Sequence, residues 1–295
     1  METPHLLLVA KDRTTQQQAL SQIHPKYHYF LQIITLSEAA SWMPLTNKAP
    51  SVIVAVGGDG TVLTAARLSL RLHEAVSFAG TATPVMGVNY GHLGFLANFP
   101  LNTKSPYPLT TAIELALNPE NAAITQETRF FATLAHPEIE DRTYHAFNEF
   151  SLAGPESDLM ISYTLSISGQ FAGHHKGNGV LVSTATGSTA YALSVGGSLL
   201  PPDNSQALQV LPVAPFSMTS RPLVVSNQPD INITVHSPSV QVRADGQTIA
   251  RFEAPVSLSF SCIRSVPFLR PTQYSWFHLI SEKLHWNTPL GRVTP

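Results

Sequence analysis

Residues 52–68 read VIVAVGGDGTVLTAARL, and this stretch determines the fold expected for the first part of the chain. Its apolar start is typical of a strand buried inside a parallel sheet. A turn with three glycines follows, and the chain then continues with the apolar spacing of a helix. Ligands of open α/β sheets bind just beyond the carboxyl ends of the strands, where this turn must lie. The stretch therefore predicts a strand, a ligand-binding turn and a helix.

Other segments of the first hundred residues repeat this alternation. Short apolar runs predict strands at 5–10, 30–36, 51–56 and 84–88. Longer amphipathic segments between them predict helices over Thr14–Ile23 and Thr61–Glu74. A strand–helix rhythm of this kind favours a doubly wound, Rossmann-like α/β domain.

The second part of the chain has the pattern of a β-rich, sandwich-like domain. A Pro-, Asn- and Ser-rich stretch at 100–108 is the expected linker, and a short helix is expected at 109–118. Alternating segments bounded by turn residues then predict strands at 128–135, 144–154, 159–168, 179–184, 231–236, 240–244 and 256–262.

The end of the chain is expected to return to the first domain. Trp276, Phe277, Ile280 and Leu284 recur at helical spacing and form one apolar face, which a lone helix must bury. We expect this helix to pack on the N-terminal domain. The predicted domains are therefore residues 1–100 with 271–295, and residues 101–270.

Composition excludes several classes of protein. The 295 residues carry a net charge of −2 and include no run of Lys and Arg, which argues against nucleic acid as a partner. No apolar stretch approaches the ~18–20 residues of a membrane span, and the apolar run at 5–10 is too short for a signal peptide. A single cysteine, Cys262, allows no internal disulfide and is expected to be buried. We expect a soluble, cytoplasmic protein.

The GGDGT turn carries the first chemical signal. Gly57, Gly58 and Gly60 let the backbone approach a phosphate closely, and the following helix contributes free N–H groups and its dipole. The carboxylate of Asp59 would repel phosphate, so we expect it to hold Mg²⁺ or to accept a proton from an attacking hydroxyl. The alternative is a tight turn with a helix-capping aspartate. The P-loop and Rossmann glycine fingerprints are both absent, which argues against an ordinary ATPase or dehydrogenase.

A second signal lies at 176–197, which read KGNGVLVSTATGSTAYALSVGG. We expect a strand, a hydroxyl-dense turn at 184–189 and a helix from Thr189 to Val195. Hydroxyls and backbone amides at this density suit the phosphates and base edge of a nucleotide. The alternative is a polar turn with Ser and Thr caps.

Together the two segments resemble the NAD kinase family. GGDGT is followed about 120 residues later by a segment close to that family's second glycine-rich motif, with Asn148-Glu149 between them. Further matches, in order along nearly the whole chain, lie at 89–97, 207–209, 221–225, 244–247 and 283–287.

The resemblance implies an N-terminal α/β domain, a C-terminal β domain and a dinucleotide site in the cleft between them. It also implies a homodimer or homotetramer in which neighbouring subunits help to form the site. The implied reaction transfers the γ-phosphoryl group of ATP, or of polyphosphate, to the 2′-hydroxyl of the adenosine ribose of NAD, giving NADP. A divalent metal, Mg²⁺, is implied, carried with the phosphate donor and without a fixed protein site.

The resemblance also assigns roles to individual residues. Asp59 matches the proton acceptor, and Asn148 and Glu149 match the pair that holds ribose hydroxyls. The phosphate-facing turn is matched by Gly57, Gly58, Gly60 and Thr61. Base, ribose and peripheral substrate contacts are matched by Phe95, Lys176, Asn178, Thr186, Thr189, Ala190, Tyr191, Ala192, Leu193, Ser194 and Gln247.

Two residues depart from the family pattern. Asn178 stands where the family has Asp, and Ala185 stands where it has Pro. An amide at 178 can still form hydrogen bonds, but it adds a donor and carries no charge, which leaves substrate preference there open. Two alternatives also stay open: a lipid kinase, which can share the GGDGT turn, and a catalytically silent regulator that binds NAD or NADP.

Overall fold

The computed structural model describes residues 5–44, 49–75, 81–90, 93–101, 108–118, 120–136, 143–156, 159–226, 230–273 and 275–286. The chain divides into two compact units. The first comprises residues 1–127 and 266–295, and the second comprises residues 128–265. Each unit has its own hydrophobic core.

A parallel sheet forms the centre of the first unit. Its strands are β1 (Leu6–Ala10), β2 (Leu31–Thr35), β3 (Val52–Gly57) and β4 (Val85–Asn89), in the order β2-β1-β3-β4. The last residues of β15 (Val256–Pro271) add a parallel strand beside β4. All five residues of β1 are buried, as expected of a strand that is covered on both faces. The four predicted strands are confirmed.

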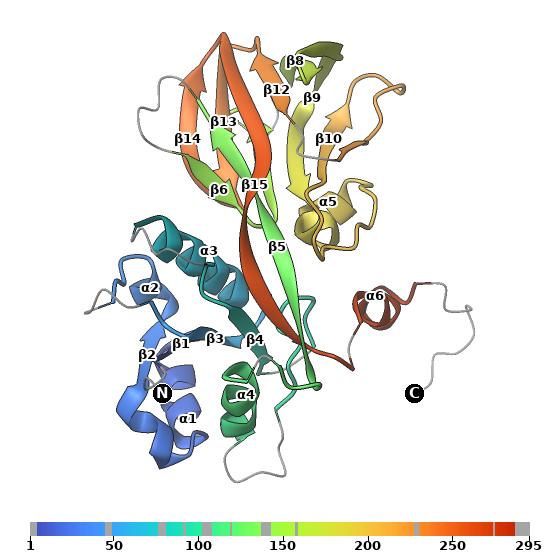
Figure 1. Cartoon of the computed structure of the whole chain (residues 1–295). Coiled ribbons are helices and arrows are strands. Elements are labelled where there is room, and N and C mark those ends of the chain that lie inside the picture. Colours follow the sequence, from blue (N-terminus) through green and yellow to red (C-terminus); the bar gives the residue numbers. More distant parts are fainter. Residues whose placement is uncertain are drawn as a thin grey trace. The chain divides into compact units, whose positions relative to one another are not determined.

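Helices cover both faces of this sheet (Figure 1). The helices α1 (Arg13–Ser21) and α4 (Pro108–Ala116) pack on one face, where Ala19 and Leu109 share a core with Val54. On the other face lies α3 (Asp59–Ala75), and a Cβ built on Gly87 of β4 would be only 2.6 Å from Cγ2 of Val62. The short helix α2 (Leu36–Ala39) and the 3-10 helix η1 (Pro25–Phe30) complete the unit. The predicted doubly wound architecture is confirmed.

The bounds of the compact units differ from the predicted domains, because α4 belongs to the first unit. Leu109, Ala112 and Ile113 of this helix are buried against the first sheet. Residues 101–127 and 266–270, which we had placed in the second domain, therefore lie in the first unit. The predicted linker falls mostly on residues 102–107, which lie outside the described part of the chain.

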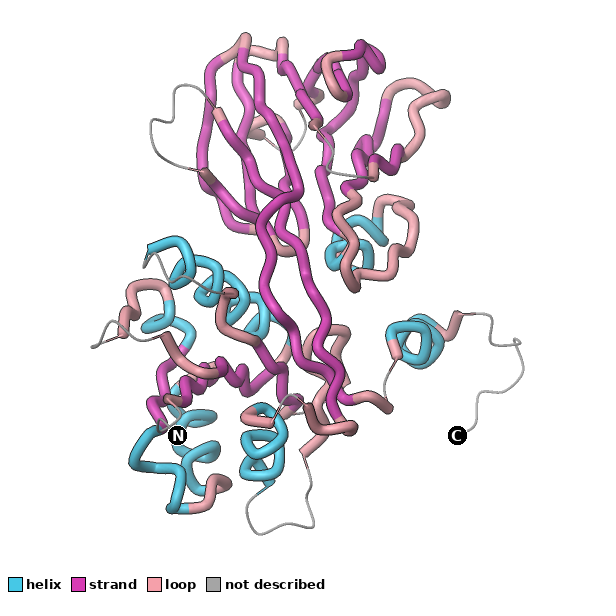
Figure 2. The backbone as a smooth tube through the Cα atoms, viewed as in Figure 1, coloured by secondary structure: helices cyan, strands magenta, loops and turns pink. Residues whose placement is uncertain are grey.

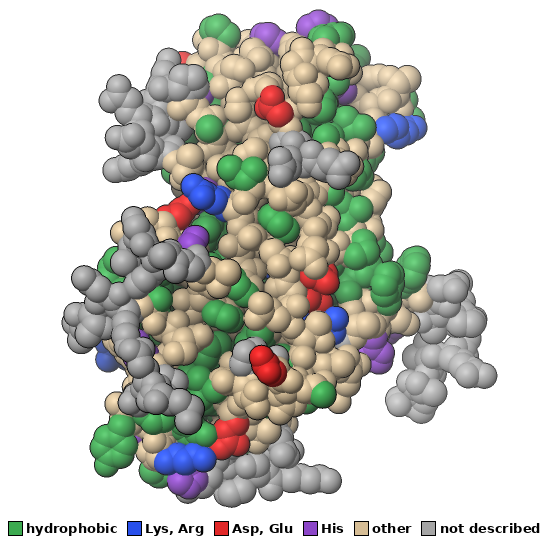
Figure 3. Space-filling model, viewed as in Figure 1, with side chains coloured by type: hydrophobic (Ala, Val, Ile, Leu, Met, Phe, Trp, Pro, Cys, Tyr) green, Lys and Arg blue, Asp and Glu red, His purple; other side chains and the backbone are tan. Residues whose placement is uncertain are grey.

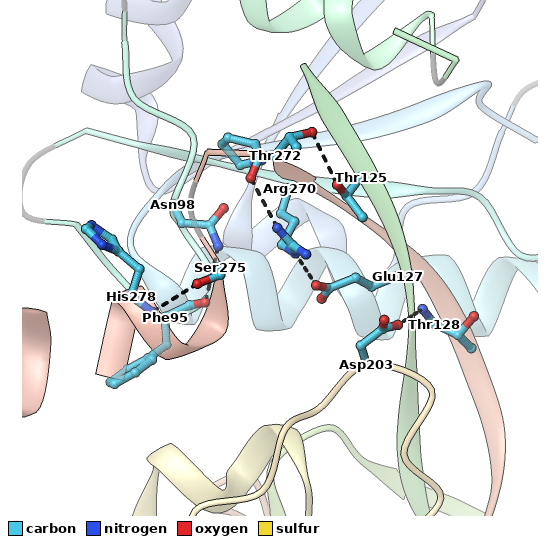
Figure 4. A network of polar contacts seen from close by, with 11 residues as sticks. Phe95, Asn98, Thr125, Glu127, Thr128, Asp203, Arg270, Thr272, Ser275 and His278 are labelled. Carbon is cyan, nitrogen blue, oxygen red and sulfur yellow. Dashed lines mark hydrogen bonds and ion pairs between the residues drawn. The ribbon is translucent and has the colours of Figure 1, made fainter. Parts of the chain in front are cut away.

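Two long strands, β5 (Ile124–Ala135) and β15, enter the first unit at one end. They pair with each other. There Glu127 of β5 forms an ion pair with Arg270 of β15, and the hydroxyls of Thr125 and Thr272 are 3.2 Å apart (Figure 4). Both charged side chains are largely buried, so their pairing offsets the cost of removing them from water.

The second unit is built almost wholly of antiparallel strands (Figure 2). Besides parts of β5 and β15, they are β6 (Tyr144–Ala146), β7 (Glu149–Ala153), β8 (Ile161–Ile167), β9 (Gln170–Thr184), β10 (Leu208–Pro215), β11 (Leu223–Val225), β12 (Ile231–Val235), β13 (Ser239–Ala244) and β14 (Gln247–Glu253). Their order is β14-β13-β7-β9-β8-β12-β15; outside this path β10 pairs with residues 177–184 of β9, and β11 pairs with β10. The predicted β-rich domain is confirmed.

Three of these strands were not expected from the sequence. Two prolines interrupt the apolar pattern of β10, and β14 carries polar side chains on both faces. The third, β11, is only three residues long. In each case strand pairing overrides a weak local signal.

Two predicted helices differ in detail. The turn before 191 forms a 3-10 helix, η2 (Thr186–Thr189), and Ala190 (φ −104°, ψ −131°) separates it from the short helix α5 (Tyr191–Ser194). The C-terminal helix α6 (Trp276–Leu284) begins at Ser275, whose hydroxyl accepts a 3.1 Å hydrogen bond from the amide of His278. It falls within the first unit, and its buried residues are Leu279 and Ile280, whereas Phe277, which was expected on the apolar face, is 61% exposed.

The surface carries few charges. On the face shown in Figure 3, the acidic and basic side chains are scattered and form no basic stripe. Of the helices that the structure describes, none has the length and apolar character needed to cross a membrane.

Candidate functional site

The GGDGT turn joins the carboxyl end of β3 to the start of α3. A Cβ at Gly57 (φ +156°) would lie 2.4 Å from the hydroxyl oxygen of Thr61, so the fold itself requires glycine there. A Cβ at Gly58 or Gly60 would have no atom within 4 Å. Gly60 lies inside the first turn of α3, where glycine is unfavourable by up to about 1 kcal/mol relative to alanine. Packing within the protein therefore does not account for these two glycines, and they leave open backbone beside the N-terminus of α3.

Asp59 is held by a loop from the next strand along the sheet. Its Oδ2 accepts a 3.0 Å hydrogen bond from the amide of Phe95, and its Oδ1 accepts bonds from Leu96 (3.0 Å) and Ala97 (2.9 Å). A Cβ on Gly94 would come within 2.0 Å of Oδ1, so glycine is needed there too. Three amides thus fix a carboxylate beside the open turn.

The same loop brings Phe95, a predicted contact residue, next to Asp59, although 36 residues separate them in the sequence. The side chain of Asn98 donates a 3.4 Å hydrogen bond to the carbonyl of Phe95 (Figure 4). Asn98 is almost fully buried, and it was not expected from the sequence to support the site.

In the second unit, the corner before β7 packs against the hydroxyl-dense turn. Thr184 donates from its hydroxyl to the carbonyl of Phe147 (2.6 Å) and from its amide to the carbonyl of Asn148 (2.9 Å). A Cβ on Gly187 would lie 2.2 Å from the same Asn148 oxygen. The predicted Asn148-Glu149 pair and the 184–189 turn therefore form one tightly packed backbone junction.

Asp245 holds this junction from a third segment, and it is a residue to which the sequence had assigned no role. Its carboxylate accepts hydrogen bonds from the amides of Phe147 (2.9 Å), Asn148 (2.6 Å) and Glu149 (3.1 Å). Its own amide donates to the carbonyl of Glu149 at 2.9 Å. Asp245 and Gly246 have φ of +46° and +81° and form the two-residue turn between β13 and β14, a geometry that Asp-Gly favours.

Buried polar side chains fix the chain on both sides of α5. The hydroxyl of Ser188 donates to the carbonyl of Leu200 and accepts from its amide (3.2 and 3.1 Å). The amide group of Gln209, which is completely buried, forms two hydrogen bonds with the backbone of Ser198 (2.8 and 2.9 Å). Gln209 is a third supporting residue, after Asn98 and Asp245, that the sequence did not identify.

The predicted contact residues around α5 differ in their exposure. Thr186 and Ala192 are buried, whereas Tyr191 is 43% exposed. Ser194 is also exposed, and the half-buried members of the set are Thr189, Ala190 and Leu193. The exposed side chains are the ones available to a ligand, and the buried ones hold the turn.

Lys176, Asn178 and Gln247 are the remaining predicted contacts in the second unit. Lys176 is exposed, with its ammonium 5.9 Å from the ring centre of Phe216. Gln247 is exposed at the start of β14. Asn178 is half-buried between Gly177 and Gly179, where added Cβ atoms would lie 2.8 and 2.5 Å from backbone carbonyl oxygens. The two glycines are therefore required by strand packing, while residue 178 is not fixed in the same way.

Comparison with known proteins places both units in one family. The model of the ATP-NAD kinase N-terminal domain matches residues 7–120, and that of the ATP-NAD kinase C-terminal domain matches residues 147–260. An NAD kinase of Acinetobacter baylyi is 32% identical over 95% of this chain and 91% of its own length. An NAD kinase of Cupriavidus pinatubonensis is 31% identical over 82% of this chain and 74% of its own length.

Solved structures share the fold. A yeast NADH kinase in complex with NADH superposes with a TM-score of 0.76 at 21% identity, covering 100% of this chain and 91% of that one. An NAD kinase from Archaeoglobus fulgidus in complex with ATP superposes with a TM-score of 0.65 at 22% identity, covering 95% of this chain and 98% of that one. Together with the matched domains and the arrangement of both motifs, these similarities show that the chain belongs to the NAD kinase family.

Proposed function

We propose that this chain phosphorylates NAD to NADP, with the γ-phosphoryl group of ATP transferred to the 2′-hydroxyl of the adenosine ribose. The observation that carries the proposal is the carboxylate of Asp59, which three amides hold beside the open backbone of Gly58 and Gly60. A carboxylate next to a phosphate site is unfavourable unless it serves the reaction, and proton acceptance is the role that fits.

The transfer forms a bond between the ribose 2′-oxygen and the γ-phosphorus and breaks the bond from that phosphorus to the oxygen bridging to the β-phosphate. Asp59 takes the proton of the 2′-hydroxyl, and ADP leaves. Each carboxylate oxygen can accept more than one hydrogen bond, so the amides of the 95–97 loop do not prevent this step. Most of the rate comes from positioning and from neutralising charge.

The acceptor is recognised in the second unit. Asn148 and Glu149 offer an amide and a carboxylate to the ribose hydroxyls, and a sugar without those hydroxyls would lose these hydrogen bonds. Contacts to the base, the ribose and peripheral parts of the substrate are assigned to Phe95, Lys176, Asn178, Thr189, Ala190, Tyr191, Leu193, Ser194 and Gln247. Thr186 and Ala192, which were also predicted as contacts, are buried and are assigned to holding the turn. A lipid kinase would have no use for the Asn-Glu pair, and a silent regulator would need the carboxylate of Asp59 only to hold the 95–97 loop.

Mg²⁺ fits this site as a companion of the donor. Among the described residues, no cluster of three or more His, Cys, Asp or Glu side chains could hold a metal ion. Mg²⁺ is commonly held by one or two carboxylates together with substrate phosphates, and Asp59 is the carboxylate placed to contribute. The ion neutralises charge on the phosphates when bound.

We further propose, from the family resemblance, a cytoplasmic homodimer or homotetramer that uses ATP or polyphosphate as donor. The oligomeric state is open to analytical ultracentrifugation, and the donor to parallel assays with the two compounds.

One assay tests the proposed function. The protein is incubated with NAD, ATP and Mg²⁺, and NADP is detected with an NADP-specific dehydrogenase. Asp59→Asn should lower turnover by about 10²–10⁴-fold, and NAD binding should stay nearly intact as long as the 95–97 loop keeps its place. Asp12→Asn is the matched control, because Asp12 caps α1 in the same unit and Asn caps equally well. Full activity of Asp59→Asn would exclude Asp59 as the base. If the wild-type protein binds NAD but forms no NADP, it is the catalytically silent regulator. If the wild-type protein does not interact with NAD at all, it is the lipid kinase.

A further inference from the structure

A lysine follows β1 at the same edge of the sheet as the GGDGT turn. Ala10 of β1 pairs with Val56 of β3, and the amide of Lys11 donates a 3.3 Å hydrogen bond to the carbonyl of Val56. A Cβ placed on Gly57 would lie 3.5 Å from the Cβ of Lys11. Lys11 is therefore the immediate neighbour of the first glycine of the turn.

The side chain of Lys11 starts on the face of the sheet that α3 covers. Leu8 and Ala10 of β1 point into the core shared with α1 and α4, so Val9 and Lys11 point to the opposite face. Val9 pairs with Ala55, which pairs in turn with Gly87, the residue that contacts α3. The ammonium of Lys11 therefore extends from the side on which α3 begins, and the residue is exposed.

The electrostatics of the turn call for a cation there. A nucleotide triphosphate carries several negative charges, and Asp59 adds one beside it. The N-terminus of α3 offers only about half a positive charge. Arg13 also lies near this edge, but its side chain is 85% exposed and 3.9 Å from the carboxylate of Glu38. Lys11, which is adjacent to Gly57, is better placed to balance the charge.

We propose that the ammonium of Lys11 binds the phosphate chain of the donor at the Gly57–Thr61 turn. A lysine is a compact charge that suits phosphate oxygens, and it does not need the planar geometry of an arginine pair. The proposal rests on the proposed function for the identity of the donor. It concerns donor binding alone and assigns Lys11 no contact with NAD.

The test compares Lys11→Met and Lys11→Gln with the wild type. For each protein, Mg-ATP binding is measured by calorimetry, NAD binding is measured separately, and the KM for ATP is taken from the NADP assay. Both variants should raise the KM for ATP and the Kd for Mg-ATP at least tenfold, with NAD binding unchanged. Lys11→Arg should retain most of the affinity. Lys26→Met is the matched control, since it removes one exposed lysine of the same unit, ion-paired to Glu114.

The outcomes separate this inference from the proposed function. Wild-type ATP binding in both folded variants would overturn the role of Lys11 and leave the NAD kinase assignment standing. The wild-type protein could also form no NADP while both variants bind ATP more weakly than it does. That result would support the role of Lys11 in donor binding and overturn NAD as the acceptor. Thermal unfolding of every variant identifies a folding defect, and using two uncharged replacements keeps the comparison valid if one of them fails to fold.

Discussion

Replacing Asp245 with glycine should damage the ribose site while the hairpin that carries Asp245 persists. Glycine adopts the left-handed φ of +46° found at this position more readily than aspartate does, so the two-residue turn is retained. The change removes the carboxylate that accepts the three amide hydrogen bonds of residues 147–149.

The size of the effect follows from those three bonds. A hydrogen bond to a charged acceptor contributes about 1.5–3 kcal/mol net, so three of them represent about 5–9 kcal/mol, and about 2–4 kcal/mol once roughly half is discounted for exposure to solvent. Asp245 is only half-buried, and water can replace part of this. We assume that this loss of about 2–4 kcal/mol falls on the Asn148-Glu149 corner and weakens transition-state binding. Because about 1.4 kcal/mol corresponds to a factor of ten, kcat/KM for NAD should decrease about 30- to 1,000-fold. We expect about 10²-fold, which is also the typical cost of displacing a reacting group by about 1 Å.

The assay is NADP formation at varied NAD, together with Mg-ATP binding and thermal unfolding. Asp245→Asn should have a kcat/KM for NAD between those of the wild type and Asp245→Gly. Its side-chain oxygen still accepts from one or two amides, while its NH₂ group faces another amide. Ser168→Gly is the matched control: Ser168 (φ +49°) is the first residue of the two-residue turn between β8 and β9. A folded Asp245→Gly protein with kcat/KM for NAD within about threefold of wild type would refute the positioning role.

Other substitutions test steric and electrostatic features of the two units. Gly57→Ala should lower the melting temperature, because the added Cβ would clash with Thr61. Gly58→Ala and Gly60→Ala should leave the melting temperature unchanged or raise it, and still reduce turnover. Circular dichroism measures the melting temperature, and the NADP assay measures turnover. Burial raises the pKa of the Cys262 thiol to about 12, so thiol reagents at mildly alkaline pH should modify it only after denaturation, as absorbance titration would show. Burial lowers the pKa of His175 below that of an unfolded histidine. The unfolded state therefore binds the proton more readily, and the free energy of unfolding should decrease as pH falls through the unfolded pKa of about 6.5; urea titrations should show a weaker acid dependence in His175→Gln.

The fold was predictable where the local pattern agreed with the tertiary structure. β1, β3 and β4 are buried on both faces, and short apolar runs of this kind predict buried parallel strands. The pattern failed for β10 and β14, because antiparallel pairing with β9 and β13 stabilises strands whose own sequences carry proline or polar residues. It also failed at the domain boundary, since nothing in the sequence of α4 shows which sheet its apolar face will meet.

The sequence names candidate site residues, but it does not predict the contacts that hold them in place. The GGDGT motif indicates Asp59, because a carboxylate is unusual in a phosphate-binding turn, whereas the Asn148-Glu149 pair is implied by the family resemblance. Nothing local indicated that Asp245 would meet amides 98 residues away, since an Asp-Gly pair predicts only a hairpin turn. Sequence patterns report the geometry of the segment that carries a residue, whereas hydrogen bonds between distant segments depend on the completed fold.

The two aspartates also change how the Asp59→Asn experiment should be interpreted. Each of them accepts three backbone amides and so fixes a loop, in addition to any role in chemistry. In Asp59→Asn, one carboxylate oxygen becomes an amide donor that faces the amides of the 95–97 loop, so a loss of turnover combines a missing base with a displaced Phe95. The pH dependence separates the two effects. Loss of the base should abolish the acidic limb of the kcat profile, whereas displacement of the loop alone should lower kcat by the same factor at every pH. A lowered profile that keeps its acidic limb would therefore assign Asp59 to positioning and transfer the proton-accepting role to another group.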